Sequence, residues 1–445
     1  MVSIEKSPIW DERDRGMFSM KLRMILRRRV LGVRAVALVL AVAVIAACTG
    51  CDSNSTKLAS SGILAQAAEL TGEVEEPDIG SSTFRNGYLS YALTLFSKVY
   101  AKNDGSTVMS PLSVMYALGM AENGAEGETL ADFEKVFGVS REEMNRILSG
   151  IIAWTESNKK LNVANSLWIK DGFAESVKQD FLKRCSEGYR STVFKTAFDG
   201  KTLEDVNKWI SDNTDKMIPK MLDSLPAGTV MMLVNAILFD QKWEKPFNKE
   251  NTQKGEPFLD KNGNKIREVD LMHGSATNYY YRDELCTSVD KYYEDGDFYF
   301  RILVPEAGVG VEDLMAALTA EYWTKIGDYA NRKEAMVTLE MPSFSYETSV
   351  GDMDKMLQEM GLARAFGQGA DFTGICDGGL CIDKVIHKAR IELNEEGTRA
   401  AAATVVTMKT TAVAPPEERI TVRADHPFVY AIMYQGIPVF LGTYE

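Results

Sequence analysis

The spacing of hydrophobic residues predicts a chain of mixed helices and strands after residue 80. From Phe84, apolar side chains recur at helical spacing. A second helical pattern follows Ser110-Pro111, where the serine caps a helix and the proline suits its first position. Residues 230–239 form an almost continuous apolar run, as expected of a strand buried on both faces. Further helices are expected at 181–189 and 203–221, and further strands at 161–170, 298–304, 335–341, 385–393, 420–422, 428–434 and 439–444.

These elements intermix without an internal repeat, and no Pro-rich or Ser-rich linker interrupts them after residue 80. The pattern therefore predicts one α+β domain over residues 81–445. Residues 48–80 are rich in serine, threonine, glycine and acidic side chains and have little apolar surface to bury. This composition is typical of a flexible tether.

The N-terminal region has the composition of an export signal. Basic residues between Lys21 and Arg34 precede an apolar stretch, Ala35–Ala47, which leads directly to Cys48. This order is similar to that of bacterial lipoprotein signals, in which residues 1–47 are removed and Cys48 carries the lipid. The alternative is an uncleaved membrane-spanning helix, but the apolar stretch is shorter than the ~20 residues that cross a bilayer. We therefore expect an exported protein held at a bacterial membrane by its lipid.

The residue that follows Cys48 bears on which membrane this is. It is threonine and not aspartate, which in lipoproteins of this kind favours transfer to an outer membrane. A periplasmic orientation and a surface or extracellular orientation both stay open.

Charge and composition exclude several classes of function. The chain of 445 residues carries a net charge of −13, which disfavours nucleic-acid binding. Its three histidines are not grouped with other ligands at metal-binding spacing, so neither a metal nor another cofactor is expected. A secreted hydrolase is disfavoured because no Gly-x-Ser-x-Gly motif is present. Cys376 and Cys381 either form a small disulfide loop or stay free.

The most informative stretch is residues 395–404, which read Glu-Glu-Gly-Thr-Arg-Ala-Ala-Ala-Ala-Thr. A run of small and β-branched residues, 405–413, follows it. If residues 398–408 formed a strand, Thr398 and the other even-numbered residues would share one uncharged face. Arg399 would lie on the opposite face, which we expect to meet solvent. An ordinary helix or linker is the alternative, since alanine favours helix, but the β-branched residues continue a helix poorly.

Short motifs along the chain resemble those of the serpins, a family of protease inhibitors, and they occur in the family's order. Each is weak by itself, but together they span residues 84–445, and residues 395–404 resemble the hinge of the family's reactive-centre loop. The motifs are Ser110-Pro111-Leu112-Ser113, Asn123–Thr129, Ala164–Trp168, Val206–Ile210, Val234–Phe239 with Trp243 and Phe247, Leu303–Pro305, Met341–Phe344, Met360–Leu362 with Phe366, Ala370–Phe372, His387–Ala389 and Asp425–Phe428.

The resemblance implies a serpin fold, an α+β fold with three β-sheets, about eight to nine helices and an exposed reactive-centre loop over about residues 395–418. It implies not an enzyme but a suicide inhibitor of serine endopeptidases, with cysteine endopeptidases as a further target class. The protease cuts the loop and forms an acyl-enzyme, and insertion of the loop into the main sheet traps it covalently. The alternative is a non-inhibitory serpin-fold binding or chaperone protein. We expect a monomer that meets a membrane only through its lipid.

The resemblance also assigns residues to the moving parts. A polar cluster where the central strands of the main sheet part, called the shutter, is expected from Ser110, Ser113, Asn235 and His387. Trp243 is expected at the breach, the end of the sheet where the loop first enters. The hinge positions are Glu395, Gly397, Thr398, Ala400, Ala401, Ala402, Ala403 and Thr404.

The bond to be cut follows from the family's usual spacing between hinge and cleavage site. Counting from Gly397 places it between Thr411 and Ala412, which suits elastase-like or broad-specificity proteases. The bond between Lys409 and Thr410 is the runner-up, and it would suit a trypsin-like enzyme.

Overall fold

Strand β5 (Met231–Phe239) is an almost unbroken apolar run because hydrophobic clusters cover both of its faces. Val234, on one face, belongs to a cluster with Trp209 of helix α7 (Gly200–Asn213). Ile237, on the other face, belongs to the large core of the molecule. The prediction of a strand buried on both faces is confirmed.

The structure is a computed structural model, and it describes residues 62–70, 74–79, 81–225, 227–294, 296–399 and 416–445. The α-helices within these residues are α2 (Ser82–Tyr100), α3 (Pro111–Glu122), α4 (Gly127–Phe137), α5 (Arg141–Asn158), α6 (Gln179–Lys183), α7, α8 (Val311–Ala317), α9 (Ala320–Gly327) and α10 (Met353–Leu357). Short 3₁₀ or π turns lie at Ala174–Ser176, Arg184–Gly188, Lys249–Asn251, Tyr329–Asn331, Gln358–Leu362 and Ala363–Phe366.

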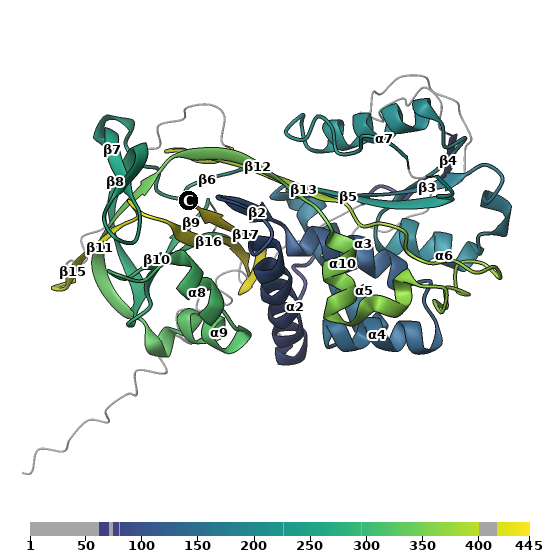
Figure 1. Ribbon diagram of the computed structural model, residues 1–445, viewed down its shortest axis with the longest axis horizontal. Helices are drawn as coiled ribbons and strands as arrows, with labels where there is room; N and C mark the ends of the chain where they lie inside the picture. The colour runs from purple at the N-terminus through teal and green to yellow at the C-terminus, as the bar shows by residue number, and fades with distance from the viewer. Residues whose placement is uncertain (1–61, 71–73, 80, 226, 295, 400–415) are drawn as a thin grey trace, which may run out of the picture. The chain divides into compact units, whose positions relative to one another are not determined.

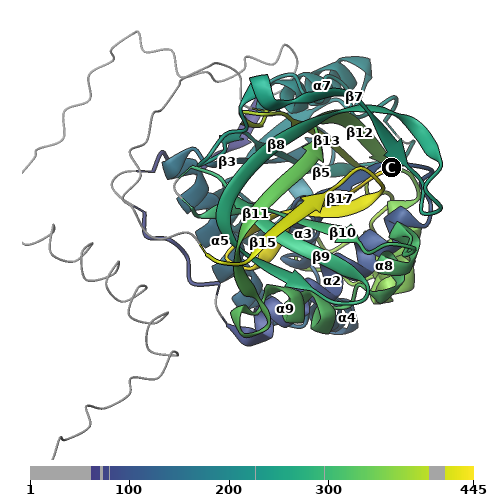
Figure 2. The ribbon, with the colours of Figure 1, turned by 90° about the vertical axis from the view of Figure 1, so that its left-hand side faces the viewer.

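The strands form three sheets, as predicted for an α+β fold (Figures 1 and 2). The first has the order β1-β4-β3-β5, from β1 (Gly62–Ala65), β4 (Thr192–Thr196), β3 (Leu161–Lys170) and β5. The third has the order β12-β13-β14-β6, from β12 (Phe344–Val350), β13 (His387–Leu393), β14 (Gly397–Thr398) and β6 (Gln241–Lys242).

The second sheet has nine strands in the order β15-β11-β8-β9-β10-β16-β17-β2, with β7 paired to β8. Its strands are β2 (Thr107–Met109), β7 (Gln253–Leu259), β8 (Lys265–Arg282), β9 (Cys286–Tyr292), β10 (Phe298–Pro305), β11 (Lys333–Pro342), β15 (Arg419–Arg423), β16 (Phe428–Tyr434) and β17 (Ile437–Tyr444).

The first and third sheets lie side by side and are separated between β5 and β13. Figure 1 shows both strands in one layer, with α7 on one face and α3 and α5 on the other. Within the described residues no backbone ladder joins β5 to β13. The separation ends at β14, which pairs with β13 on one side and with β6, the continuation of β5, on the other.

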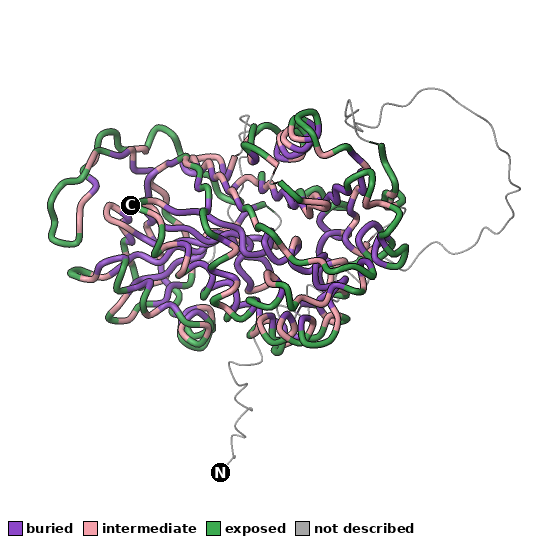
Figure 3. Tube along the Cα trace, turned by 45° about the vertical axis from the view of Figure 1, so that its right-hand side comes forward, coloured by how far each residue is buried: buried purple, intermediate pink, exposed green. Residues whose placement is uncertain are grey.

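Helix α3 is buried almost all around. Eleven of its residues, including Ser113 and Glu122, are buried, which is the pattern of a helix enclosed by other elements. Figure 3 shows buried residues concentrated along the central strands and helices, with exposed residues on loops and outer helices. No helix among the described residues has both the length and the apolarity to cross a bilayer.

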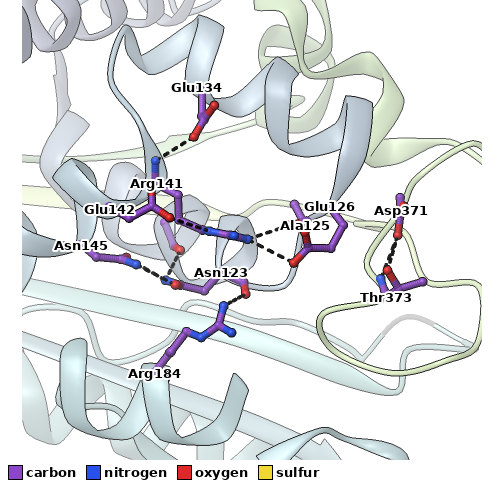
Figure 4. A network of polar contacts seen from close by, with 11 residues as sticks. Asn123, Ala125, Glu126, Glu134, Arg141, Glu142, Asn145, Arg184, Asp371 and Thr373 are labelled. Carbon is purple, nitrogen blue, oxygen red and sulfur yellow. Dashed lines mark hydrogen bonds and ion pairs between the residues drawn. The ribbon is translucent and has the colours of Figure 1, made fainter. Parts of the chain in front are cut away.

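The turn after α3 is held by side chains from two neighbouring elements, α5 and the π turn Arg184–Gly188 (Figure 4). Asn123 and Asn145 donate amide hydrogen bonds to one another at 2.9 and 2.8 Å. Arg184 donates to the carbonyl oxygen of Asn123 at 3.0 Å, and Arg141 donates to that of Ala125 at 2.9 Å. These bonds fix the C-terminal end of α3, so that the helix presents its N-terminal end to the sheet in one position.

Two predictions of secondary structure are corrected. The helix expected over 203–221 ends at Asn213, because Asp215 and Lys216 have left-handed backbones with φ of 45° and 66°. The tether expected over 48–80 contains β1, which pairs with β4 and forms the edge of the first sheet. The tether prediction is therefore wrong for β1, where backbone pairing, not side-chain burial, orders the segment.

Glu122, the last residue of α3, is an ionisable group without a partner in the described structure. It is fully buried, and neither carboxylate oxygen has a hydrogen-bond partner there. Burial raises the pKa of Glu122 to about 8, repulsion from Glu134 adds to this rise, and Arg141 opposes it. The side chain is therefore mostly protonated at neutral pH in the folded protein.

Replacing Glu122 by glutamine should stabilise the protein most at alkaline pH. The folded chain keeps its proton up to about pH 8 and the unfolded chain releases it near 4.5, so the wild type loses stability as pH rises between these values. We expect the Glu122→Gln advantage in free energy of unfolding to grow by roughly 3–5 kcal/mol across that window. Urea unfolding at pH 5 and 8.5 measures it, with Glu175→Gln as an exposed control. Equal advantages at both pH values would refute the assignment.

Candidate functional site

The N-terminal turn of α3 bridges the two separated strands. The Ser110 backbone N–H donates to Nε2 of His387 on β13 at 3.0 Å. One turn later, the Ser113 hydroxyl donates to Oδ1 of Asn235 on β5 at 2.5 Å. The Ser110 hydroxyl caps the helix by accepting from the Ser113 N–H at 3.1 Å. The structure thus brings together the four residues that the sequence grouped as a shutter.

Asn235 extends this cluster across the first sheet. Its amide donates to Oδ1 of Asn165 on β3 at 2.8 Å, and the Asn165 amide donates to the carbonyl oxygen of Tyr189 at 2.8 Å. Both asparagines are buried, so each needs partners inside the protein. Sequence reasoning did not single out Asn165, although it lies in the motif Ala164–Trp168.

Two adjoining hollows follow the separation between β5 and β13. The first, beside α3, is lined by residues of the shutter, including Asn235 and His387. The second, beside the hinge, is lined by Phe239 of β5, Ile391 of β13 and Thr398 of β14. Residues from both strands line each hollow, and each hollow has room for little more than one water molecule. The space between the strands is therefore a narrow groove that ends at the hinge.

The hinge already occupies the end of this groove. Gly397 pairs with Lys242, and Thr398 pairs with both Gln241 and Leu393, in antiparallel register. Glycine is required at 397 because a Cβ atom there would lie 2.1 Å from the carbonyl oxygen of Gln241. Gly397 and Thr398 of the hinge therefore form a strand between the two halves of the main layer.

Thr398 points into the core. It is buried and its hydroxyl lies 2.5 Å from the hydroxyl of Tyr293. Tyr293 in turn stacks on Trp243, with ring centroids 4.4 Å apart. The expectation that Thr398 belongs to the uncharged, buried face holds at this position.

Trp243 also holds the turn that precedes the hinge. Its backbone N–H donates to the carbonyl oxygen of Glu396 at 2.9 Å, and its indole N–H donates to that of Asn394 at 3.0 Å. The neighbouring carboxylate of Glu395 accepts from the Thr252 hydroxyl at 2.8 Å. The predicted breach residue and the predicted hinge therefore touch directly.

Arg399 departs from the prediction that it meets solvent. It lies on the outer side, opposite to Thr398, but its side chain is only 15% exposed because the turn after α7 covers it. The guanidinium pairs with the carboxylate of Asp215. Sequence reasoning missed this contact because it continued α7 as a helix through residue 221.

Several predicted residues lie outside the described residues. These are Cys48, the hinge positions Ala400, Ala401, Ala402, Ala403 and Thr404, and the candidate cleavage positions Lys409, Thr410, Thr411 and Ala412.

Two further predictions concern the pair Cys376 and Cys381 and the binding of a metal. Cys376 is buried and Cys381 exposed, and both are free thiols. No group of three or more metal-binding side chains occurs in this part of the chain.

His387 is neutral at physiological pH. Burial lowers its pKa to about 4. Nε2 accepts the hydrogen bond from the Ser110 N–H, so the proton of the neutral ring is on Nδ1. Protonation of Nε2 would break the link between α3 and β13.

The unfolding free energy should fall as pH drops from about 6.5 to about 4, because the unfolded chain binds a proton on His387 before the folded chain does. The gap between the two pKa values corresponds to roughly 2–3 kcal/mol. Chemical denaturation of wild type and His387→Gln at pH 7.5, 5.5 and 4 measures it. The variant is expected to be less stable at pH 7.5 and to lose less stability on acidification. Identical pH dependence in the two proteins would contradict a neutral, buried His387.

The chain was compared with known protein families and structures. The family model described as Serpin (serine protease inhibitor) matches residues 86–445. Iripin-2 of Ixodes ricinus is 32% identical over 357 residues, which cover 77% of this chain and 87% of that protein. A serpin-like protein of Thermococcus kodakarensis is 29% identical over 371 residues, or 80% and 84% of the two chains.

Solved structures agree with the family match. The native state of the thermophilic serpin tengpin is similar with a TM-score of 0.73 and 31% identity, covering 86% of this chain and 99% of that one. The latent state of tengpin is similar with a TM-score of 0.69 and 29% identity, covering 83% and 99%. With the family model matching nearly the whole body of three sheets, the chain belongs to the serpin family.

Proposed function

We propose that this protein inhibits serine endopeptidases as a suicide substrate, with cysteine endopeptidases as a further target class. Serpins are generally protease inhibitors. The observation that carries the proposal here is the position of Gly397 and Thr398, which already pair at the end of the narrow groove between β5 and β13. The protein itself supplies no catalytic group, since the protease performs the cleavage.

The register of the hinge supports insertion of the residues that follow. Thr398 pairs with Gln241 on one side and Leu393 on the other. Continued one residue at a time, this register sets Ala400 opposite Phe239 and Met408 opposite Met231. Residues 400–408 therefore match the whole length of β5.

The same register supports the prediction that the even-numbered residues of the inserted strand share one uncharged face. Alternate residues of β13, from His387 to Leu393, are buried, and in register they face Thr404, Ala402, Ala400 and Thr398. Insertion then places small, uncharged side chains toward the core. About ten new backbone hydrogen bonds at ~1 kcal/mol net each would stabilise the inserted state by roughly 10 kcal/mol.

Cleavage frees this segment to insert while the protease is still attached as an acyl-enzyme. Insertion carries the attached protease from one end of the sheet to the other. Distortion of its oxyanion hole would stop deacylation. The native state is then a kinetically trapped one, whose stored free energy drives the trap.

The target class follows from the residues around the cleaved bond. We propose cleavage between Thr411 and Ala412 by an elastase-like or broad-specificity protease, since both side chains are small. Cleavage between Lys409 and Thr410 by a trypsin-like enzyme is the alternative.

Mixing the purified protein with elastase-like, trypsin-like and papain-like proteases tests the proposal. We expect a covalent complex on denaturing gels, and mass spectrometry of the released peptide identifies the cut. The cleaved protein should melt at least roughly 15 °C higher than the intact protein, in keeping with the insertion energy. Proteases that cut the loop and stay active would refute inhibition and favour a binding protein.

Thr398→Arg should turn the inhibitor into a substrate. A charge at this buried position would need a partner that the Tyr293 hydroxyl cannot supply. We expect normal cleavage, at least tenfold less covalent complex, and a smaller gain in melting temperature. Thr398→Ser, which keeps the hydroxyl, is the matched control and should trap protease like the wild type. Equal trapping by Thr398→Arg would contradict insertion in this register.

We also propose that Cys48 carries a lipid that holds the protein at a bacterial outer membrane. The signal-like order of residues 21–48 supports this. Expression in a bacterial host with radiolabelled palmitate is expected to label the wild type and not Cys48→Ala, with Cys51→Ala as the control. Labelling of Cys48→Ala would refute the assignment.

A further inference from the structure

Arg399 follows the last residue of β14, and its backbone is unusual. Thr398 before it is paired on both sides. Arg399 itself has φ of 55°, in the left-handed region that side chains other than glycine seldom adopt. Its N–H still donates to the carbonyl oxygen of Glu392 at 2.6 Å. A residue kept in such a conformation needs contacts that hold it there.

The turn after α7 supplies those contacts. Nη1 of Arg399 donates to the carbonyl oxygen of Thr214 at 3.3 Å, and Nη2 donates to that of Asp215 at 3.2 Å. Nη2 also pairs with the Asp215 carboxylate. The left-handed backbones of Asp215 and Lys216 end the helix and turn these acceptors toward the hinge.

The surrounding charges match arginine and not an acid. Asp240, between β5 and β6, lies close enough to Arg399 and to Asp215 for its charge to interact with both. Lys242 is the nearby cation. A carboxylate at 399 would face two aspartates, so the arginine at 399 and the aspartates around it form one matched set.

We propose that the Arg399–Asp215 ion pair is a latch that holds the hinge with Gly397 and Thr398 inserted, and that it must open before residue 400 can follow. To continue the strand, φ of Arg399 has to change from 55° to an extended value. That change swings the backbone away from the position in which the guanidinium reaches Thr214 and Asp215. Arg399 is thus a positioning residue, and its consequence for protease trapping rests on the proposed function.

Hydrogen exchange tests the latch without any protease. Two amides report on it: that of Arg399, bonded to Glu392, and that of Trp243, bonded to Glu396. We expect Asp215→Asn to speed exchange of both by about threefold or more, the effect of losing a partly exposed ion pair. Asp212→Asn is the matched control, since Asp212 lies in the last turn of α7, three residues before Asp215, and pairs with Lys208 instead. Exchange that is unchanged in Asp215→Asn would overturn the latch.

Salt and charge reversal separate a latch from a general structural role. Salt at 1 M should speed exchange of these amides in the wild type and not in Asp215→Asn, because salt screens exposed charges. Arg399→Glu and Asp215→Arg should each speed exchange by about tenfold, and the double variant should recover at least half of that change on a logarithmic scale. Strictly additive effects in the double variant would overturn the pairing.

The protease measurement distinguishes the two proposals. If the latch limits insertion, Asp215→Asn traps a larger share of the protease molecules that cut it than the wild type or Asp212→Asn does. An equal share with faster exchange would mean that the latch holds the hinge but does not limit insertion. If the wild type traps no protease at all, the proposed function fails, and the exchange data still decide whether the latch exists.

Discussion

The structure depends on two strand edges that face each other without forming a ladder. Backbone N–H and C=O groups on β5 and β13 would normally pair, and an unpaired edge is a site for any added strand. In the described residues these strands are bridged instead by the first turn of α3 and closed at one end by β14. The neighbouring elements, α3 and β14, are arranged so that they hold the two strands apart.

Helix α3 can bridge the strands only because it is buried and fixed at both ends. Its N-terminal serines line the hollow beside α3, and the bonds to Asn123 and Ala125 hold its C-terminal turn. Polar partners suit this role better than an apolar contact would. Asn235 and a neutral His387 form hydrogen bonds to α3, and such bonds have strict geometry. A hydrogen bond can be exchanged for another when a new strand inserts. Tightly packed apolar side chains resist such a change.

The sequence was sufficient for the parts of the site that lie within one element. The apolar run of β5, the serine cap of α3 and the alternation of β13 each have a local pattern, and the structure has all three. It was insufficient where the local structure depends on the backbone conformation of single residues or on pairing with a distant strand. The strands that were not predicted are β1, β2, β4, β6, β7, β8, β9 and β12. Of these, β8 and β9 carry polar residues among the apolar ones. The end of α7 was missed because two non-glycine residues turn left-handed there, and with it the partner of Arg399.

The length of the groove constrains where the loop can be cut. If the loop inserts in the register of the hinge, Met408 would be the last residue with a partner on β5, since Met231 is the first residue of that strand. A cut before Met408 would leave the groove partly empty and forgo some of the new hydrogen bonds. A cut a few residues beyond it leaves the strand complete and gives the attached protease a short connection to the far end of the sheet. Both candidate bonds, after Lys409 and after Thr411, meet this condition, so the choice between them belongs to the specificity of the protease and not to the fold.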